Sequence, residues 1–203
     1  MAQKVYAVVS QKGGVGKTST SYSLAVSFAL EGKSVLLADF DSEQKSAVEI
    51  YESRATPIEN LTVKFFKSVE DMAIFSRPYK IIVADGAPHA SATTLALAGV
   101  ADRIIIPTGT PMVDLRPAAR LALELIDSGI ERKRVRLALY KTLTPAETLS
   151  AHEALSEQDL KVAGSLKSSA AYASALDAGK ALQEVSHPSL KDAAALYIER
   201  LKA

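Results

Sequence analysis

The sequence contains no cysteine among its 203 residues. Without thiols it holds no disulfide, no thiolate metal site and no cysteine nucleophile, and iron–sulfur carriers are excluded because cysteine holds their clusters. No apolar run approaches the roughly 20 residues that span a bilayer. No signal peptide is visible, because the first apolar run, residues 5–9, leads directly into a glycine-rich segment. These absences favour a protein of a reducing cytoplasm.

Strong charge of one sign is absent as well. Lysine and arginine nearly balance aspartate and glutamate, which leaves a formal net charge of +1. The overall charge therefore indicates neither a nucleic-acid-binding nor a membrane-binding protein, and any such surface would be a local patch.

Glycine and lysine are concentrated in "SQKGGVGKTST", residues 10–20, which follows an apolar run and precedes a helical pattern. Glycines let the backbone approach phosphate oxygens closely, and a helix start presents N–H groups to an anion. Lys17 is placed to reach the β- and γ-phosphates, and the Thr18 hydroxyl to ligate Mg²⁺. The first glycine of the general phosphate-loop pattern is replaced by Gln11. We predict that the nucleotide is bound by Gly13, Gly14, Val15, Gly16, Lys17, Thr18 and Ser19.

Short apolar runs alternate with longer helical patterns along the chain. Several runs are continuous Val, Ile and Leu, as expected of strands buried on both faces. Strands are expected at residues 4–9, 34–39, 62–66, 80–85, 103–107, 135–139 and 160–165, and helices at 17–31, 43–55, 68–76, 90–99, 114–128, 146–157, 169–179 and 189–202. This alternation predicts one domain, residues 1–203, of the three-layer α/β class, with a mainly parallel central sheet and helices on both faces.

Carboxylates stand at two predicted strand ends: Asp39 and Asp41 in "SVLLADFDSE", and Asp85 in "KIIVADGAP". Asp85 follows four apolar residues, like a Walker-B aspartate that holds Mg²⁺. Asp41 is the candidate for orienting the attacking water, and Asp39 for bonding to the water shell of the metal. The alternative for each is a strand-end carboxylate that caps the next helix.

The segment "KGGVGKT" resembles the deviant Walker-A box of the ParA/MinD family, which is marked by an extra lysine, here Lys12. "DFD" and "VADGAP" resemble the family's second and third acidic boxes, and the resemblance continues through "ADRIIIPTGTPMVDLRPA" and "LKSSAAYASALDAGKALQEV". Gln11 and a start at the Walker-A strand resemble the small partition ATPases that lack an N-terminal helix-turn-helix domain. One departure is that Ser42 and Glu43 follow Asp41 where Pro-Gln is usual.

The resemblance implies a P-loop ATPase that binds ATP and Mg²⁺ and works as a homodimer. ATP is then sandwiched between two protomers, Lys12 reaches across to the phosphates of the other protomer, and catalysis depends on Lys12, Lys17 and Asp41. Hydrolysis is weak until a ParB-like or other centromere-binding adaptor stimulates it. Dimers of such proteins coat nucleoid DNA without sequence preference, which implies a cytoplasmic, nucleoid-associated protein that segregates a plasmid or chromosome.

The resemblance also suggests where the base lies, because loops after the later strands contact adenine in similar proteins. Tyr140, Lys141 and residues 167–173 are therefore candidates. No Asn-Lys-x-Asp segment is present to read guanine, which favours ATP over GTP.

The clearest basic cluster is "ERKRVR", with Arg132, Lys133, Arg134 and Arg136. It is a candidate DNA surface because phosphate contacts need clustered cations, and its alternative is an ordinary solvated face. The C-terminal segment "SLKDAAALYIERLKA" is amphipathic, with a stripe formed by Leu190, Ala193, Ala194, Tyr197 and Leu201. Its apolar face is small and alanine-rich, so we expect it to pack on its own domain rather than on a membrane.

Three other functions remain open at this stage. The same ATPase cycle would position another cargo, such as a microcompartment or a chemoreceptor cluster. A MinD-like membrane-associated regulator is disfavoured by Gln11 and by the weak C-terminal helix. A metabolic ligase on the same scaffold would need a substrate pocket beside the γ-phosphate, and we find no extra set of carboxylates or arginines in the sequence that demands one.

Overall fold

A computed structural model describes residues 2–88 and 91–203, and within these residues seven strands form one sheet. The strands are β1 (Lys4–Val8), β2 (Val35–Asp39), β3 (Leu61–Phe65), β4 (Ile81–Asp85), β5 (Arg103–Thr108), β6 (Val135–Thr142) and β7 (Val162–Lys167). The helices are α1 (Lys17–Leu30), α2 (Ser46–Glu52), α3 (Val69–Phe75), α4 (Ser91–Val100), α5 (Met112–Asp127), α6 (Pro145–Ser156), α7 (Ala170–Asp177) and α8 (Pro188–Lys202), with 3-10 turns η1 (Arg132–Arg134) and η2 (Leu182–Glu184). Each predicted strand is confirmed.

The sheet is parallel throughout, in the order β3-β2-β4-β1-β5-β6-β7. The register pairs Val8 with Asp85 and Asp39 with Asp85. The carboxyl ends of β1, β4 and β2 therefore lie side by side, and the predicted phosphate loop follows directly after β1.

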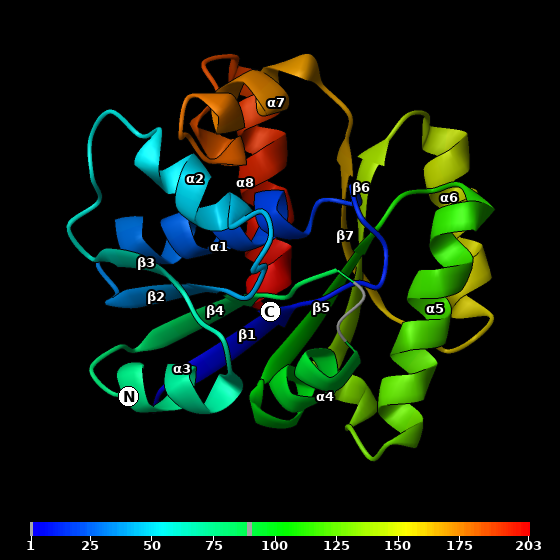
Figure 1. The fold of residues 1–203 in the computed structure, drawn as a ribbon. Coiled ribbons are helices and arrows are strands. Elements are labelled where there is room, and N and C mark those ends of the chain that lie inside the picture. Colours follow the sequence, from blue (N-terminus) through cyan, green and yellow to red (C-terminus); the bar gives the residue numbers. More distant parts are fainter. Residues whose placement is uncertain (1, 89–90) are drawn as a thin grey trace.

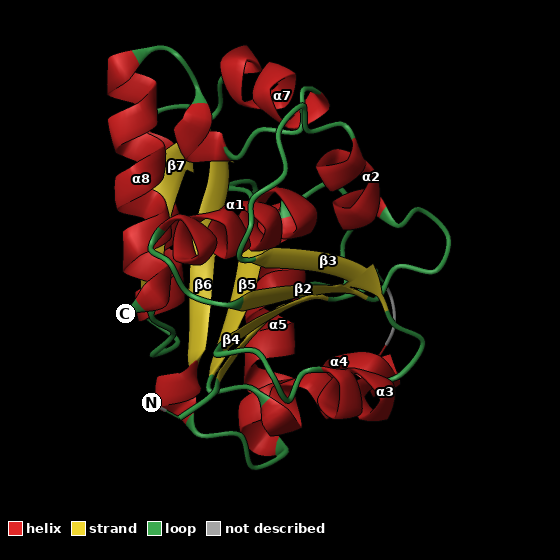
Figure 2. Ribbon diagram, turned by 90° about the vertical axis from the view of Figure 1, so that its left-hand side faces the viewer, coloured by secondary structure: helices red, strands yellow, loops and turns green. Residues whose placement is uncertain are grey.

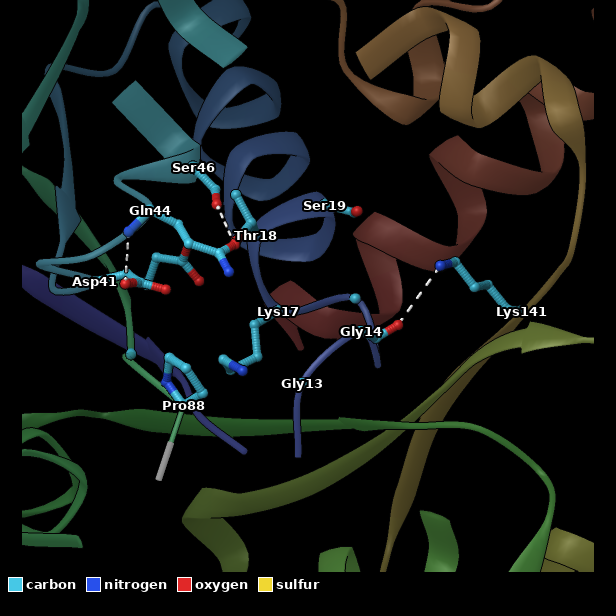
Figure 3. A pocket seen from close by; sticks show the side chains of 13 residues that line it. Gly13, Gly14, Lys17, Thr18, Ser19, Asp41, Gln44, Ser46, Pro88 and Lys141 are labelled. Atoms are coloured by element: carbon cyan, nitrogen blue, oxygen red, sulfur yellow. Dashed lines mark hydrogen bonds between the residues drawn. The ribbon is translucent and has the colours of Figure 1, made fainter. Parts of the chain in front are cut away.

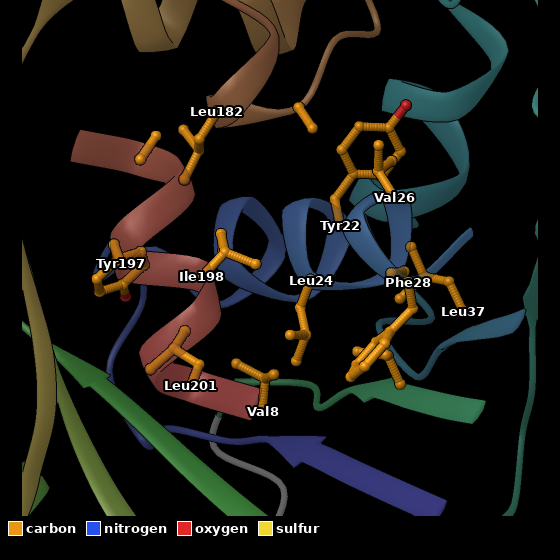
Figure 4. Close-up of a cluster of buried hydrophobic side chains, with 14 of the residues drawn as sticks. Val8, Tyr22, Leu24, Val26, Phe28, Leu37, Leu182, Tyr197, Ile198 and Leu201 are labelled. Atoms are coloured by element: carbon orange, nitrogen blue, oxygen red, sulfur yellow. The ribbon is translucent and has the colours of Figure 1, made fainter. Parts of the chain in front are cut away.

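Helices cover both faces of the sheet, as the alternation predicts (Figures 1 and 2). Helices α1, α2, α7 and α8 pack on one face, and α3 to α6 pack on the other. Alternate residues of each strand enter different cores: in β2, Leu37 joins the first and Leu36 the second. Figure 4 shows the first core, where Leu24 of α1 and Ile198 and Leu201 of α8 meet over the sheet. Both faces are buried, which explains the continuous apolar strands.

Helix α2 is shorter than the predicted span of residues 43–55. The Asp41 side chain accepts hydrogen bonds from the backbone N–H groups of Glu43 and Gln44, both at 3.0 Å, which makes a turn instead of a helix start. Lys45 then takes a left-handed conformation with φ of +49°. The residues after Asp41 therefore form a loop at the carboxyl end of β2. Residue 90 of the predicted helix 90–99 lies outside the described residues.

The C-terminal helix packs on its own domain, as predicted. Ala194, Tyr197, Ile198 and Leu201 of α8 are buried. The predicted stripe was wrong at Ala193, which is exposed while Ile198 faces the core, because residues four apart lie on the same side of a helix. In the described part of the chain, no helix combines the length and apolarity that crossing a membrane requires.

A partly buried ion pair fixes the end of α2 to the segment around η2. The Arg54 guanidinium donates to both carboxylate oxygens of Glu184, at 2.7 and 2.6 Å, and to the carbonyl of Gly179 at 3.1 Å. Tyr22 of α1 donates to the same carbonyl at 2.7 Å. The backbones of Arg54 and Gly179 lie so close that a Cβ on Gly179 would sit 2.3 Å from the backbone nitrogen of Arg54.

Gly179→Ala tests this joint. Gly179 has a φ of +69° as well as the close contact, so we expect the alanine variant to lose about 2–4 kcal/mol of unfolding free energy. The matched control is Gly99→Ala in α4, where nothing lies within 4 Å of the added Cβ and helix propensity predicts a gain of up to about 1 kcal/mol. Urea denaturation measures the unfolding free energy of both variants. Equal values would contradict the proposed importance of the close contact between Gly179 and Arg54.

Candidate functional site

A cavity of about 270 Å³ lies at the carboxyl ends of β1, β2 and β4 (Figure 3). It is lined by Gly13, Gly14, Gly16, Lys17, Thr18, Ser19, Asp41, Gln44, Ser46, Asp85, Gly86, Pro88 and Lys141. The structure thus brings most of the predicted phosphate loop together with two of the three predicted carboxylates. Val15, also predicted to bind the nucleotide, is a buried residue of the loop and does not line this cavity.

The glycine-rich loop depends on glycine at two positions. Gly14 and Gly16 have φ of +76° and +95°, a region that residues with a Cβ rarely adopt. A Cβ on Gly16 would also lie 2.2 Å from the ring of Tyr140. Gly16 is the N-cap of α1, so the loop leads straight into the helix whose first residue is Lys17. Backbone N–H groups at this helix start form the electropositive end that favours anions.

Lys17 is an unusual lysine because only 8% of its surface is exposed. Its Nζ donates to the backbone carbonyl of Lys12 at 3.2 Å. Burial lowers the pKa of Lys17, while the carboxylates of Asp85 and Asp41 act in the opposite direction. The Lys17 ammonium is shielded from water, points into a cavity and has one neutral acceptor. Such a cation is suited to binding an anionic ligand.

Asp85 is 2% exposed, and its Oδ1 has no hydrogen-bond partner among the described residues. Burial raises its pKa to about 7, and the nearby carboxylate of Asp39 adds to the shift. The hydroxyl of Thr18 and the ammonium of Lys17 lower it. An orphaned carboxylate oxygen that lines a cavity beside a threonine hydroxyl is the donor set that Mg²⁺ prefers.

Asp39 and Asp41 occupy different positions although they are two residues apart. Asp39 is fully buried, and its two oxygens accept backbone N–H groups from Asp41 at 2.9 Å and from Ala47 at 3.0 Å. It is not among the residues that line the cavity. The geometry matches the helix-capping alternative, and a contact between Asp39 and the metal's water shell stays a prediction. Asp41 does line the cavity.

The residues present therefore fit a magnesium nucleotide. The glycine loop leaves room that Cβ atoms would fill, Lys17 supplies buried positive charge, and the orphaned oxygen of Asp85 lies beside Thr18. Phosphate contacts by the loop and Mg²⁺ contacts by Thr18 and Asp85 stay predictions.

Lys12 is turned away from this cavity. Its ammonium forms an ion pair with the carboxylate of Asp114 in the first turn of α5, and it lies 3.5 Å from the carbonyl of Val113. That carbonyl has no helical donor, because residue 117 is a proline inside α5 and lacks an N–H. The Lys12 side chain remains 38% exposed. The lysine that marks the loop is thus held on the surface by α5.

A second cavity of about 90 Å³ adjoins the first and shares Ser19 and Lys141 with it. It is lined by Ser19, Tyr140, Lys141, Lys167, Ser168, Ser169, Tyr172, Ala173 and Leu176. Lys141 sits at an irregularity between β6 and β7 with a φ of +60°, and its Nζ lies 3.5 Å from the Gly14 carbonyl. The structure brings the adenine candidates together, and their contact with a base stays a prediction.

The basic cluster lies at η1 and the start of β6, at the sheet edge opposite the cavity. Two of its arginines cap helix ends: Arg134 donates to carbonyls at the end of α4, one at 2.5 Å, and Arg132 donates at 3.0 Å to a carbonyl after α6. Arg136 donates to the Val135 carbonyl at 2.8 Å, and Lys133 pairs with Glu131 at 2.7 Å. The DNA contact predicted for this cluster stays a prediction, and the contacts with helix ends give Arg132 and Arg134 structural roles.

Sequence reasoning missed several residues around the cavity. Gln44, Ser46, Gly86 and Pro88 line it, and their only sequence signal is that they follow Asp41 or Asp85 within five residues. Asp114 was missed as the partner of Lys12 because the two are 102 positions apart.

Asp85→Asn changes how stability depends on pH. The folded-state pKa of about 7 exceeds the ordinary carboxyl value of about 3.9, so the folded protein holds this proton more tightly than the unfolded chain. The wild type should therefore lose stability as pH rises from about 4 to about 7, a loss of about 2–4 kcal/mol that the variant lacks.

Urea denaturation of both proteins without nucleotide, from acid to mild alkali, measures this difference. The matched control is Asp127→Asn, which removes one carboxylate at an exposed position. An Asp85→Asn difference that is constant with pH would contradict the shifted pKa.

Comparison with known proteins agrees with this geometry. A family model described as the CobQ/CobB/MinD/ParA nucleotide binding domain matches residues 6–191. The chain is 26% identical over 179 residues to the chromosome-partitioning ATPase Soj of Thermus thermophilus, which covers 72% of each protein. It is 26% identical over 164 residues to the maintenance of carboxysome distribution protein A of Gloeobacter kilaueensis, covering 77% of this chain and 73% of that protein.

The fold is also similar to solved structures. The septum site-determining protein MinD of Pyrococcus horikoshii, solved as a complex with Mg-ADP, has a TM-score of 0.76 at 15% identity, covering 97% of this chain and 94% of that one. The family model spans most of the sequence and includes the glycine loop and both cavities. The chain therefore belongs to the CobQ/CobB/MinD/ParA nucleotide-binding family, as a ParA/MinD-type ATPase.

Proposed function

We propose that this protein is an ATP-dependent dimerisation switch of the partition type. The observation that carries the proposal is the position of Lys12, whose ammonium lies outside the cavity of its own protomer, on the surface beside α5. A lysine there is placed to meet the phosphates of a second protomer. Two protomers that face each other across ATP then form the active homodimer.

Within one protomer, the glycine loop binds the phosphates through backbone N–H groups, and Lys17 neutralises the β- and γ-phosphates. Thr18 and Asp85 hold Mg²⁺, which spreads the charge of the transferred phosphoryl group when bound. Tyr140, Lys141 and the residues of the second cavity hold the adenine. The Mg-ADP found with the Pyrococcus horikoshii protein supports this choice of ligand.

Asp41 is the residue we assign to orienting the attacking water. Its Oδ1 already accepts two backbone N–H groups from its own loop, which fixes the carboxylate but draws charge away from water. Lys12 would complete the site only in the dimer, so a lone protomer lacks one of the cations that stabilise phosphoryl transfer. Both features support slow hydrolysis until an adaptor protein acts on the dimer.

We further propose that the ATP-bound dimer binds nucleoid DNA without sequence preference and moves a plasmid or chromosome with a ParB-like adaptor. The similarity to the chromosome-partitioning ATPase Soj supports this cargo. The similarity to a carboxysome-distribution protein supports the second candidate, which is the same cycle applied to another cargo. A MinD-like membrane role gains no support from α8, whose apolar side chains are used in the core.

Lys12 and Asp114 should act in opposite directions on dimerisation. Lys12→Ala should retain nucleotide affinity but lose ATP-dependent dimers, since the cation that bridges the protomers is gone. Asp114→Asn should lower the protein concentration needed for dimers by roughly tenfold, about 1.4 kcal/mol, because Lys12 no longer has to leave a carboxylate.

Light scattering with ATP measures dimerisation, and binding of a fluorescent ATP analogue measures nucleotide affinity. Lys133→Ala, a change at an exposed lysine in a surface ion pair, is the matched control. Normal ATP-dependent dimers of the Lys12→Ala variant would contradict the role of Lys12 on which the proposal depends.

DNA binding in different nucleotide states tests the function itself. With random-sequence duplex DNA, we expect tight binding with ATP only, weakened steeply by salt because phosphate contacts release counterions. Fluorescence anisotropy with ATP, ADP and no nucleotide, at two salt concentrations, measures this. Absence of binding in every state would leave the nucleotide site intact and exclude the partition role.

A further inference from the structure

A second surface feature lies outside the nucleotide cavity, between the end of β3 and α3. It is a groove of about 390 Å³ lined by Lys64, Phe65, Phe66, Lys67, Asp71, Ile74 and Phe75, and we call it the lysine–aromatic groove. Strand β3 is an outermost strand of the sheet. The groove therefore opens at the edge of the molecule and shares no lining residue with the nucleotide cavity.

The groove has an apolar wall that the fold leaves exposed. Ile74 is 66% exposed and Phe75 is 36% exposed. Phe66, at 5% exposure, forms the floor, and its ring lies 5.5 Å from the ring of Phe75. Two large apolar side chains that face solvent beside a hollow are typical of a docking site for another apolar group.

The rim of the groove carries lysines whose charge no carboxylate balances. The Nζ of Lys64 lies 4.0 Å from the centre of the Phe75 ring, and the Nζ of Lys45 lies 5.3 Å from that of Phe65. Over residues 2–88 and 91–203, neither these lysines nor Lys67 form an ion pair. Asp71 is the one acidic residue in the lining. Cation–π contacts hold the ammonium groups of Lys64 and Lys45 over rings of the groove lining while leaving them available to anions.

We propose that the lysine–aromatic groove docks an acidic segment of a partner protein, with one apolar side chain of that segment inserted beside Ile74 and Phe75. Charge complementarity selects acidic residues around that anchor. A nucleic acid fits less well, because Lys64 lies over the Phe75 ring, Lys45 lies over the Phe65 ring and Phe66 is buried, so the aromatic rings of the lining are already covered. Ile74 offers nothing to a phosphate.

The groove is connected to the nucleotide site through the backbone. Lys45 ends the loop that begins at Asp41, and its N–H donates to the Asp41 carbonyl at 3.0 Å. The N–H of Phe66 donates to the carbonyl of Asp39 at 2.8 Å. The carboxylates of a docked segment would attract the Lys45 ammonium away from the Phe65 ring. Because Lys45 ends the loop that begins at Asp41, docking would then change the position of that loop. This consequence rests on the role in hydrolysis proposed for Asp41.

Peptide display tests the groove directly. Random peptides are selected on the full-length protein, and an enriched peptide is synthesised with a fluorescent label for anisotropy. We expect enriched sequences rich in Asp and Glu around a Leu or Phe. The double change Lys64→Glu, Lys67→Glu should weaken binding roughly tenfold or more, and Ile74→Ser should weaken it as well.

The matched control is Lys161→Glu with Lys191→Glu, the same change of charge at two exposed lysines that do not line the groove, and it should bind as wild type does. Enriched peptides without an acidic excess, or equal binding by the groove variant, would overturn the proposal. So would binding of a labelled single-stranded oligonucleotide that the groove variant loses, because it would assign the groove to nucleic acid.

ATP turnover at saturating peptide tests the connection to Asp41. Turnover should change in the wild type and not in the groove variant, and an unchanged rate in the wild type would overturn this part. Peptide binding by a protein that shows no turnover under any condition would instead count against the proposed function and leave the docking surface in place.

Discussion

The site depends on the removal of opposite charges from water at one edge of a parallel sheet. Lys17 and Asp85 are both almost completely buried, yet no ion pair joins them in the described residues. Burial lowers the pKa of Lys17 and raises that of Asp85, because the charged form of each group is unfavourable away from water. The phosphates of a nucleotide, together with their cation, would supply an oppositely charged partner for each of these two groups. The arrangement therefore favours the nucleotide-bound protein over the free protein.

Other residues at the carboxyl edge of the sheet fix the backbone around the cavity, and each does so through different contacts. Asp39 uses both oxygens on backbone N–H groups and fixes the start of α2, whereas Asp41 fixes its own loop. Tyr140 lies against the loop at Gly16. Two carboxylates with the same local sequence signal thus differ because one faces the sheet interior and the other faces the cavity.

Sequence reasoning located the seven strands and the phosphate loop because both signals are local: apolar runs mark buried strands, and clustered glycines mark a strained turn. It placed Asp85 beside the loop because parallel strands end at the same edge. It gave Asp39 and Asp41 different roles but did not predict that only Asp41 lines the cavity, since that depends on side-chain orientation. It also missed the pairing of Lys12 with Asp114 and the helix-capping bonds of Arg134, which depend on contacts between segments distant in the chain.

The strand order has a consequence for how the protein is made. Strand β1 lies in the middle of the sheet, between β4 and β5, although it is synthesised first. It cannot pair with both neighbouring strands until residue 108, the end of β5, has emerged from the ribosome. During that interval the glycine-rich segment has no framework, and its apolar strand is available to chaperones. Nucleotide binding is therefore a property that the nascent chain acquires only after β4 and β5 have emerged.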